Sequence, residues 1–165
     1  MHIKLIQNIL KFGLALTLIA SFNSTAFAAD IAKCGALKGY VNFHHHGLVP
    51  KNKSGFSEDT ISGAMTSLVK TPSGNYDILL IDAANTIKSF IADGGKISLF
   101  RKGARDATLM HLSPAGVIEI YTFWEDGDGS YKYDLMTSKG GDGIPIHLSR
   151  LLTGDCEFID FAAIN

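Results

Sequence analysis

The fold is decided by the stretch Val117-Ile118-Glu119-Ile120-Tyr121-Thr122-Phe123-Trp124, which the turn sequence Asp126-Gly127-Asp128-Gly129 follows closely. β-branched and aromatic residues dominate this stretch, as is typical of a strand. An extended chain points alternate side chains to opposite faces, and here both faces carry apolar groups. The pattern predicts a strand buried partly on both faces and followed by a hairpin turn.

Similar short runs lie on both sides of this stretch. Turn sequences separate them, at residues 71–75, 93–95 and 113–116. Connections this short favour antiparallel hairpins, since parallel strands need longer crossovers. The sequence therefore predicts an all-β domain, a sandwich or an up-and-down barrel of about eight strands. The expected strands are 39–46, 61–70, 75–83, 86–92, 96–102, 107–112, 116–124 and 130–137.

Two segments also fit a helix. Ile61, Met65 and Leu68 have helical spacing, although Gly63 disfavours a helix and a strand is preferred there. Residues 145–153 are expected to form a short helix that ends near Gly154.

Residues 1–28 have the three zones of a secretory signal peptide. Lys4 and Lys11 precede an apolar run over 12–22, and a polar stretch leads to the cleavage sequence Ala26-Phe27-Ala28. The apolar run is shorter than the roughly 20 residues of a membrane-spanning helix, so no stable membrane anchor is expected. The sequence predicts a protein exported to the periplasm or the extracellular space, with one β-rich domain over 29–165.

The charge of that domain bears on its partners. The full chain has 15 basic and 16 acidic residues, and loss of Lys4 and Lys11 leaves a formal charge of about −3. The basic residues are scattered, whereas a nucleic-acid surface needs a contiguous positive patch. Nucleic acid is not expected as a partner; an unknown protein or small molecule is.

The only two cysteines, Cys34 and Cys156, lie near the two ends of the predicted domain. Export would place them in an oxidising compartment, where pairing is the default. The sequence predicts a disulfide between them that stabilises the fold by roughly 4 to 5 kcal/mol in the chain-entropy model.

Three consecutive histidines, His44-His45-His46, suggest a metal site. On a strand, His44 and His46 would share a face and could bind one zinc or copper ion. A third ligand would have to come from elsewhere, with His111, His147 or a nearby carboxylate as candidates. The alternative is an exposed polar strand end that leads into Gly47 and Pro50.

Catalytic motifs are incomplete. Asp126-Gly127-Asp128-Gly129 lacks the ligand spacing of an EF-hand and fits a hairpin turn better. No G-x-S-x-G or H-E-x-x-H sequence occurs. Glu119 and Asp82 lie in apolar stretches, a setting in which a carboxyl group can serve as a general acid, but an outward-facing strand position is the more common reason for such a residue. No catalytic residue and no cofactor site are therefore assigned.

The aromatic side chains also have two interpretations. They could line a ligand groove, or they could pack within the core and between strands. These residues are Tyr40, Phe43, Tyr76, Tyr121, Phe123 and Trp124.

A resemblance covers most of the predicted domain. It rests on the segments 56–63, 74–78, 82–83 and 120–123 together with the two framing cysteines. With these, the chain resembles a group of short exported bacterial proteins of uncharacterised function. The resemblance implies an intact domain and no particular activity.

Two function classes remain open. The first is an exported, non-enzymatic binding or interaction domain, with its ligand on a sheet face or in a barrel mouth. The second is an exported metal-binding protein that uses His44 and His46.

Overall fold

The computed structural model describes residues 29–165, and the predicted signal peptide over 1–28 lies outside these residues. The described chain is all-β, with one short 3₁₀ turn, η1 (Lys51–Lys53). Its strands are β1 (Ala29–Phe43), β2 (Gly55–Ile61), β3 (Met65–Lys70), β4 (Tyr76–Ile81), β5 (Ile87–Ser89), β6 (Lys96–Lys102), β7 (Asp106–Leu112), β8 (Ile118–Glu125), β9 (Tyr131–Lys139) and β10 (Leu148–Ile159).

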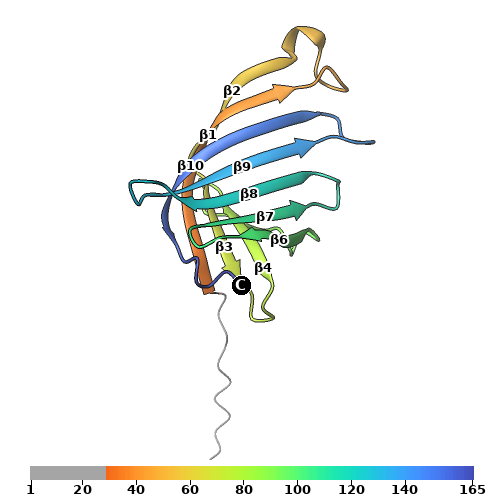
Figure 1. The fold of residues 1–165 in the computed structure, drawn as a ribbon. Coiled ribbons are helices and arrows are strands. Elements are labelled where there is room, and N and C mark those ends of the chain that lie inside the picture. The colour runs from red at the N-terminus through yellow and green to blue at the C-terminus, as the bar shows by residue number, and fades with distance from the viewer. Residues whose placement is uncertain (1–28) are drawn as a thin grey trace, which may run out of the picture.

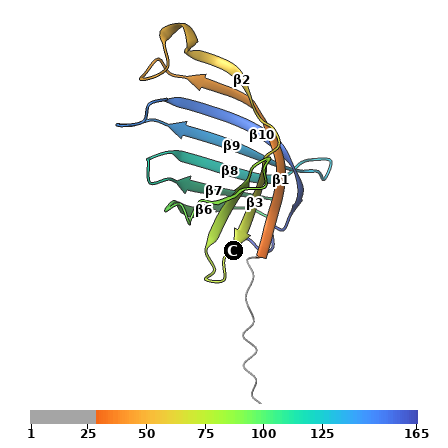
Figure 2. The same ribbon diagram turned by 180° about the vertical axis from the view of Figure 1, so that it is seen from behind.

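All of these strands belong to one curled antiparallel sheet that forms a half-barrel (Figures 1 and 2). The strand order is β5-β4-β3-β1-β10-β9-β8-β7-β6, with β2 also paired to β1. Most neighbours in the sequence are neighbours in the sheet, as the short turns predict, but β1 pairs with β3 and β10, β2 does not pair with β3, and β5 and β6 lie at opposite ends of the strand order. The pairing of β1 with β10 joins the first and last strands of residues 29–165, and the predicted all-β class is confirmed.

The long strand β1 organises the sheet. Its first part pairs with β3, from Ala29 opposite Lys70 to Cys34 opposite Thr66. Its second part pairs with β2, which lies beyond β1 at the top of the sheet in Figure 1. On its other side β1 pairs with β10, and at Gly39 a Cβ atom would lie 2.2 Å from the carbonyl oxygen of Leu151. A residue without a side chain is therefore needed at this contact.

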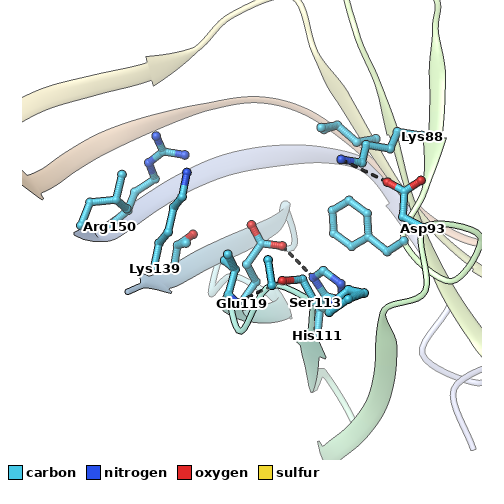
Figure 3. Close-up of a pocket in the computed structure, with 14 residues that line it drawn as sticks. Lys88, Asp93, His111, Ser113, Glu119, Lys139 and Arg150 are labelled. Atoms are coloured by element: carbon cyan, nitrogen blue, oxygen red, sulfur yellow. Dashed lines mark hydrogen bonds and ion pairs between the residues drawn. The ribbon is translucent and has the colours of Figure 1, made fainter. Parts of the chain in front are cut away.

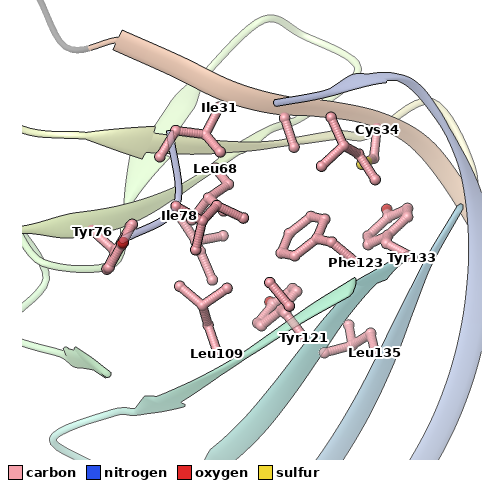
Figure 4. Packing of buried hydrophobic residues seen from close by; sticks show 14 of the residues in the cluster. Ile31, Cys34, Leu68, Tyr76, Ile78, Leu109, Tyr121, Phe123, Tyr133 and Leu135 are labelled. Atoms are coloured by element: carbon pink, nitrogen blue, oxygen red, sulfur yellow. The ribbon is translucent and has the colours of Figure 1, made fainter. Parts of the chain in front are cut away.

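The core lies on the concave side of the sheet, where side chains from both halves of the chain meet (Figure 4). Residues without solvent exposure include Ile31, Leu68, Ile78, Leu109, Phe123, Tyr133 and Ile164. Ile164 comes from the C-terminal segment, whose last residue is held by Tyr76: the Tyr76 hydroxyl lies 2.7 Å from both the backbone oxygen and the backbone nitrogen of Asn165.

The predicted disulfide is confirmed. Cys34 on β1 and Cys156 on β10 are bonded, and they lie opposite each other in the strand ladder. The bond closes a loop with a sequence separation of 122 residues. No helix long and apolar enough to cross a bilayer occurs within residues 29–165.

The helix expected over 145–153 is wrong, because strand β10 begins at Leu148. Alternation explains the difference: Leu148 and Leu152 are buried on the concave side, whereas Ser149 and Leu151 are exposed. Pairing with β1 on one edge and β9 on the other uses both edges of the backbone, which favours a strand over an isolated helical turn.

Other strand boundaries also differ from expectation. The strand expected over 39–46 begins ten residues earlier and ends at Phe43, because the chain turns at Gly47, which has φ +57°. The strand expected over 61–70 begins later, as β3 at Met65, because the chain turns at Gly63, where φ is +71°, and Ile61 instead ends β2. The strands expected at 96–102 and 107–112 agree with β6 and β7 to within one residue.

Candidate functional site

Four polar residues form a row across the concave face. Arg150 on β10 lies opposite Thr137 on β9, Thr137 lies opposite Glu119 on β8, and Glu119 lies opposite His111 on β7. Their strand neighbours two residues away, such as Leu135 and Leu152, are apolar and buried. The antiparallel register thus places a polar row beside the hydrophobic core.

This row borders an open cavity of about 570 Å³ (Figure 3). Besides the row, apolar groups, two further cations, one carboxylate and one hydroxyl line it: Leu80, Lys88, Phe90, Asp93, Ser113, Pro114, Ala115, Val117, Lys139 and Leu148. A smaller hollow of about 130 Å³ shares Leu80, Phe90, Glu119 and Arg150 with the first and has mostly apolar walls. Ligand pockets typically combine such apolar walls with a few polar groups, and their volumes are about 300–1,000 Å³.

His111 is fixed from several sides. It is only 5% exposed, and its ring stacks on Phe90 with the ring centroids 4.3 Å apart. Its Nδ1 atom lies 2.9 Å from Oε2 of Glu119, and an ionised carboxylate can only accept, so Nδ1 carries the proton. Its Nε2 atom faces Gly95, where a Cβ atom would lie 2.4 Å away. The imidazole is therefore held by packing as well as by Glu119.

Glu119 accepts a second hydrogen bond on the same oxygen. The Tyr121 hydroxyl donates to Oε2 over 3.2 Å. Burial raises the pKa of Tyr121 well above its ordinary value, and the negative charge of Glu119 raises it further. Tyr121 therefore stays a neutral donor, and Glu119 is held at one oxygen by two side chains.

The charged groups at the cavity are unequally paired. Lys88 pairs with Asp93 over 3.1 Å, and Nε of Arg150 pairs with Oδ2 of Asp59 over 2.7 Å. Lys139 has no ion-pair partner within residues 29–165. Cations therefore outnumber their acidic partners at the end of the cavity near β9 and β10.

Thr137 has an unused hydroxyl. The residue is 8% exposed, and its Oγ1 atom is buried without a hydrogen-bond partner in the described part of the chain. A buried polar group without a partner costs about 1–3 kcal/mol, so the position favours a ligand atom or water beside it.

The predicted metal ligands lie elsewhere. His44 and His46 follow the end of β1 in a turn, so the expectation that they share a strand face is wrong. His46 stacks on His147 with ring centroids 3.8 Å apart, and Nε2 of His44 lies 3.4 Å from the Ser149 hydroxyl. No group of three or more His, Cys, Asp or Glu side chains suited to a metal ion occurs over 29–165. Metal binding by His44 and His46 stays a prediction.

The other acidic candidates are divided between turns and the cavity. Asp82 is in a turn, where its carboxylate accepts from the backbone N–H groups of Ala84 and Thr86. Asp126 and Gly129 close the hairpin between β8 and β9, as expected for that sequence. Glu119 lies on the concave side at the cavity, rather than facing outward.

The aromatic residues are similarly divided. Tyr121 belongs to the core together with Tyr76 and Phe123 and also lines the smaller hollow, whereas Tyr40 is 59% exposed.

Sequence reasoning missed Thr137, Lys139 and Arg150. Arg150 fell within the expected helix, and Lys139 lay beyond the predicted end of its strand. The alternation of Leu148, Arg150 and Leu152 was the available signal, since it places a cation on the apolar face of a strand.

The curled sheet and its cavity define a small, disulfide-linked antiparallel β protein with a pocket on the concave side. No family model, curated protein or solved structure matches the chain. The resemblance to short exported proteins stays a prediction, and the cavity with its lining residues is the feature that bears on function.

Proposed function

We propose that this chain is an exported, non-enzymatic binding protein whose concave cavity holds a small amphipathic molecule. The carrying observation is the polar row of Arg150, Thr137, Glu119 and His111 beside an apolar-walled cavity of about 570 Å³. Apolar walls favour the body of a ligand through the hydrophobic effect, and the polar row would orient its head group.

A binding role fits the way the polar row is held. His111 is enclosed by Phe90, Gly95 and Glu119, which leaves its ring fixed in place. Such rigid polar groups reduce the entropy lost on binding, because they need no reordering when a ligand arrives.

Export is supported by the signal-peptide pattern over 1–28 together with the bond between Cys34 and Cys156. Mass spectrometry of the protein secreted by a bacterial host tests this part. Cleavage after Ala28 and the absence of free thiols are expected. A full-length, cytosolic chain with two free thiols would contradict it.

The binding function is tested with N-phenylnaphthylamine, a neutral dye that fluoresces in apolar pockets. Val117 lines the cavity, whereas the next residue, Ile118, lies on the other face of the sheet beside Ile120 and Met136. Val117→Trp should obstruct the cavity and weaken dye binding about tenfold or more, which corresponds to about 1.4 kcal/mol. Ile118→Trp is the matched control and should bind as the original chain does.

Circular dichroism and the melting temperature show whether both variants fold. Equal dye binding by the two folded variants, or no dye binding by the original chain, would contradict the proposal.

A further inference from the structure

Two cations project into the same end of the cavity from neighbouring strands. Arg150 on β10 lies opposite Thr137 on β9, and Lys139 is two residues beyond Thr137 on the same strand. Arg150 and Lys139 are therefore diagonal neighbours on one face, a relation in which long side chains can reach each other. Figure 3 shows both side chains extending into the cavity.

Only one of the two like charges has an acidic partner at this end. Arg150 forms an ion pair with Asp59 through Nε, but neither Nε of Arg150 nor Oδ2 of Asp59 has a hydrogen-bond partner within residues 29–165. Lys139 has no acidic partner within 4.0 Å among the described residues. Like charges at a diagonal position repel each other, and an anion placed between them would remove that cost.

The hydroxyl of Thr137 supplies a third, neutral donor. Thr137 stands directly opposite Arg150 and on the same strand face as Lys139, and its Oγ1 atom is buried without a partner in the described chain. A carboxylate accepts several hydrogen bonds through its two oxygens, which matches a guanidinium, an ammonium and a hydroxyl around one point.

From this arrangement we infer that the cavity binds an organic carboxylate, with its head group at Thr137, Lys139 and Arg150. The inference rests on the proposed binding function and names the chemical class of the ligand. The apolar body of the ligand lies against Leu80 and Phe90, which line both the main cavity and the smaller hollow.

Other charged side chains around the cavity determine where the carboxylate head group of the ligand lies. Glu119 stands on the far side of Thr137, where its Oε2 atom is occupied by His111 and Tyr121. Its negative charge repels an anion, so the head group stays on the Lys139 side of the row. Lys88, on β5, is 59% exposed and paired with Asp93, so it contributes little.

The test uses the untagged protein and displacement of bound N-phenylnaphthylamine by three ligands of equal chain length: octanoate, octanol and octylammonium. Octanoate should displace the dye at a concentration about tenfold lower than octanol does, since a charge-assisted contact has that order of effect. Octylammonium should be the weakest. Lys139→Met keeps the length of the side chain and should remove the preference for octanoate while the dye still binds.

Lys132→Met is the matched control. Lys132 is also on β9, but it pairs with Asp155 and does not line the cavity, so its loss should leave the preference unchanged. Melting temperatures establish that both variants are folded.

The failures of the two proposals are distinguishable. If the dye binds and octanol competes as well as octanoate, or if Lys139→Met keeps the preference, the anion inference is wrong while the binding function stands. Stronger competition by octylammonium would also overturn it and point to Glu119. If neither the dye nor any of the three ligands binds, both proposals fail.

Discussion

The Nδ1 atom of His111 on β7 lies 2.9 Å from the Oε2 atom of Glu119 on β8, in a directly opposed pair of the strand ladder. Both side chains are largely buried, with side-chain exposures of 7% and 18%. Removing one partner leaves the other without its hydrogen bond in a poorly hydrated place, which costs more than the bond itself contributes.

Glu119→Ala should therefore lower the free energy of unfolding by about 1–3 kcal/mol. Glu119→Gln retains an acceptor and should recover part of the loss. Urea unfolding at neutral pH measures both. The control is Glu157→Ala, since Glu157 is 67% exposed in its pair with Lys33 and should change stability by no more than about 0.5 kcal/mol. If Glu119→Ala and Glu157→Ala lower the free energy of unfolding equally, the contact between Glu119 and His111 stabilises the protein no more than an exposed ion pair does.

Gly39→Ala should be strongly destabilising. The added Cβ atom would lie 2.2 Å from the Leu151 carbonyl oxygen, so β1 and β10 would have to separate. Overpacking typically costs about 1–3 kcal/mol, and backbone atoms cannot move aside as a side chain can. Thermal unfolding provides the measurement. Gly127→Ala, in a hairpin turn with nothing within 4 Å of the new atom, should melt close to the original temperature.

Reduction of the Cys34–Cys156 bond should lower the free energy of unfolding by roughly 4 to 5 kcal/mol in the chain-entropy model. The bond joins β1 to β10, and in the unfolded chain it reduces the conformational entropy of nearly the whole domain. Urea unfolding with and without dithiothreitol measures the change, and the double variant Cys34→Ser with Cys156→Ser should resemble the reduced protein. Unchanged stability on reduction would contradict the expected role.

Tyr133 should make stability depend on alkaline pH. Burial raises the pKa of Tyr133 from 10.0 to about 12, although a hydrogen bond with Thr66 opposes the shift. Between these values the folded chain keeps a proton that the unfolded chain loses, so the free energy of unfolding falls as pH rises. The contribution is complete below pH 10 and is lost on passing through about pH 12.

Tyr133→Phe isolates the contribution of Tyr133 to the pH dependence of stability, since the original chain and the variant share all other tyrosines. The variant also loses the hydrogen bond from the Tyr133 hydroxyl to the Gly35 oxygen. The stability difference between the original chain and the variant should be constant below pH 10 and should shrink above it, by up to about 1.4 kcal/mol per pH unit. A difference that stays constant up to pH 12 would exclude the raised pKa.

The metal prediction has its own experiment. Elemental analysis of the untagged protein after incubation with zinc or copper should give about one ion per chain if His44 and His46 bind metal, and His44→Ala with His46→Ala should remove it. His147→Ala adds information, because its ring stacks on His46. A metal-free chain with an unchanged melting temperature would refute the prediction.

The sequence by itself determined the fold class, most strand positions and the disulfide. Alternation, β-branched residues and turn sequences are local signals, and a hairpin such as that at Asp126–Gly129 can be predicted from a few neighbouring residues. The pairing of Cys34 with Cys156 followed from counting, since the chain has only two cysteines.

Only the tertiary structure decided where β1 and β10 pair and which side chains meet in the cavity. The row of His111, Glu119, Thr137 and Arg150 spans four strands, so its members are neighbours only through the strand register. Register depends on pairing between distant segments, and a shift of one residue would turn every side chain in a strand to the opposite face. For that reason Arg150 could be assigned to a helix from the sequence and yet belong to the cavity.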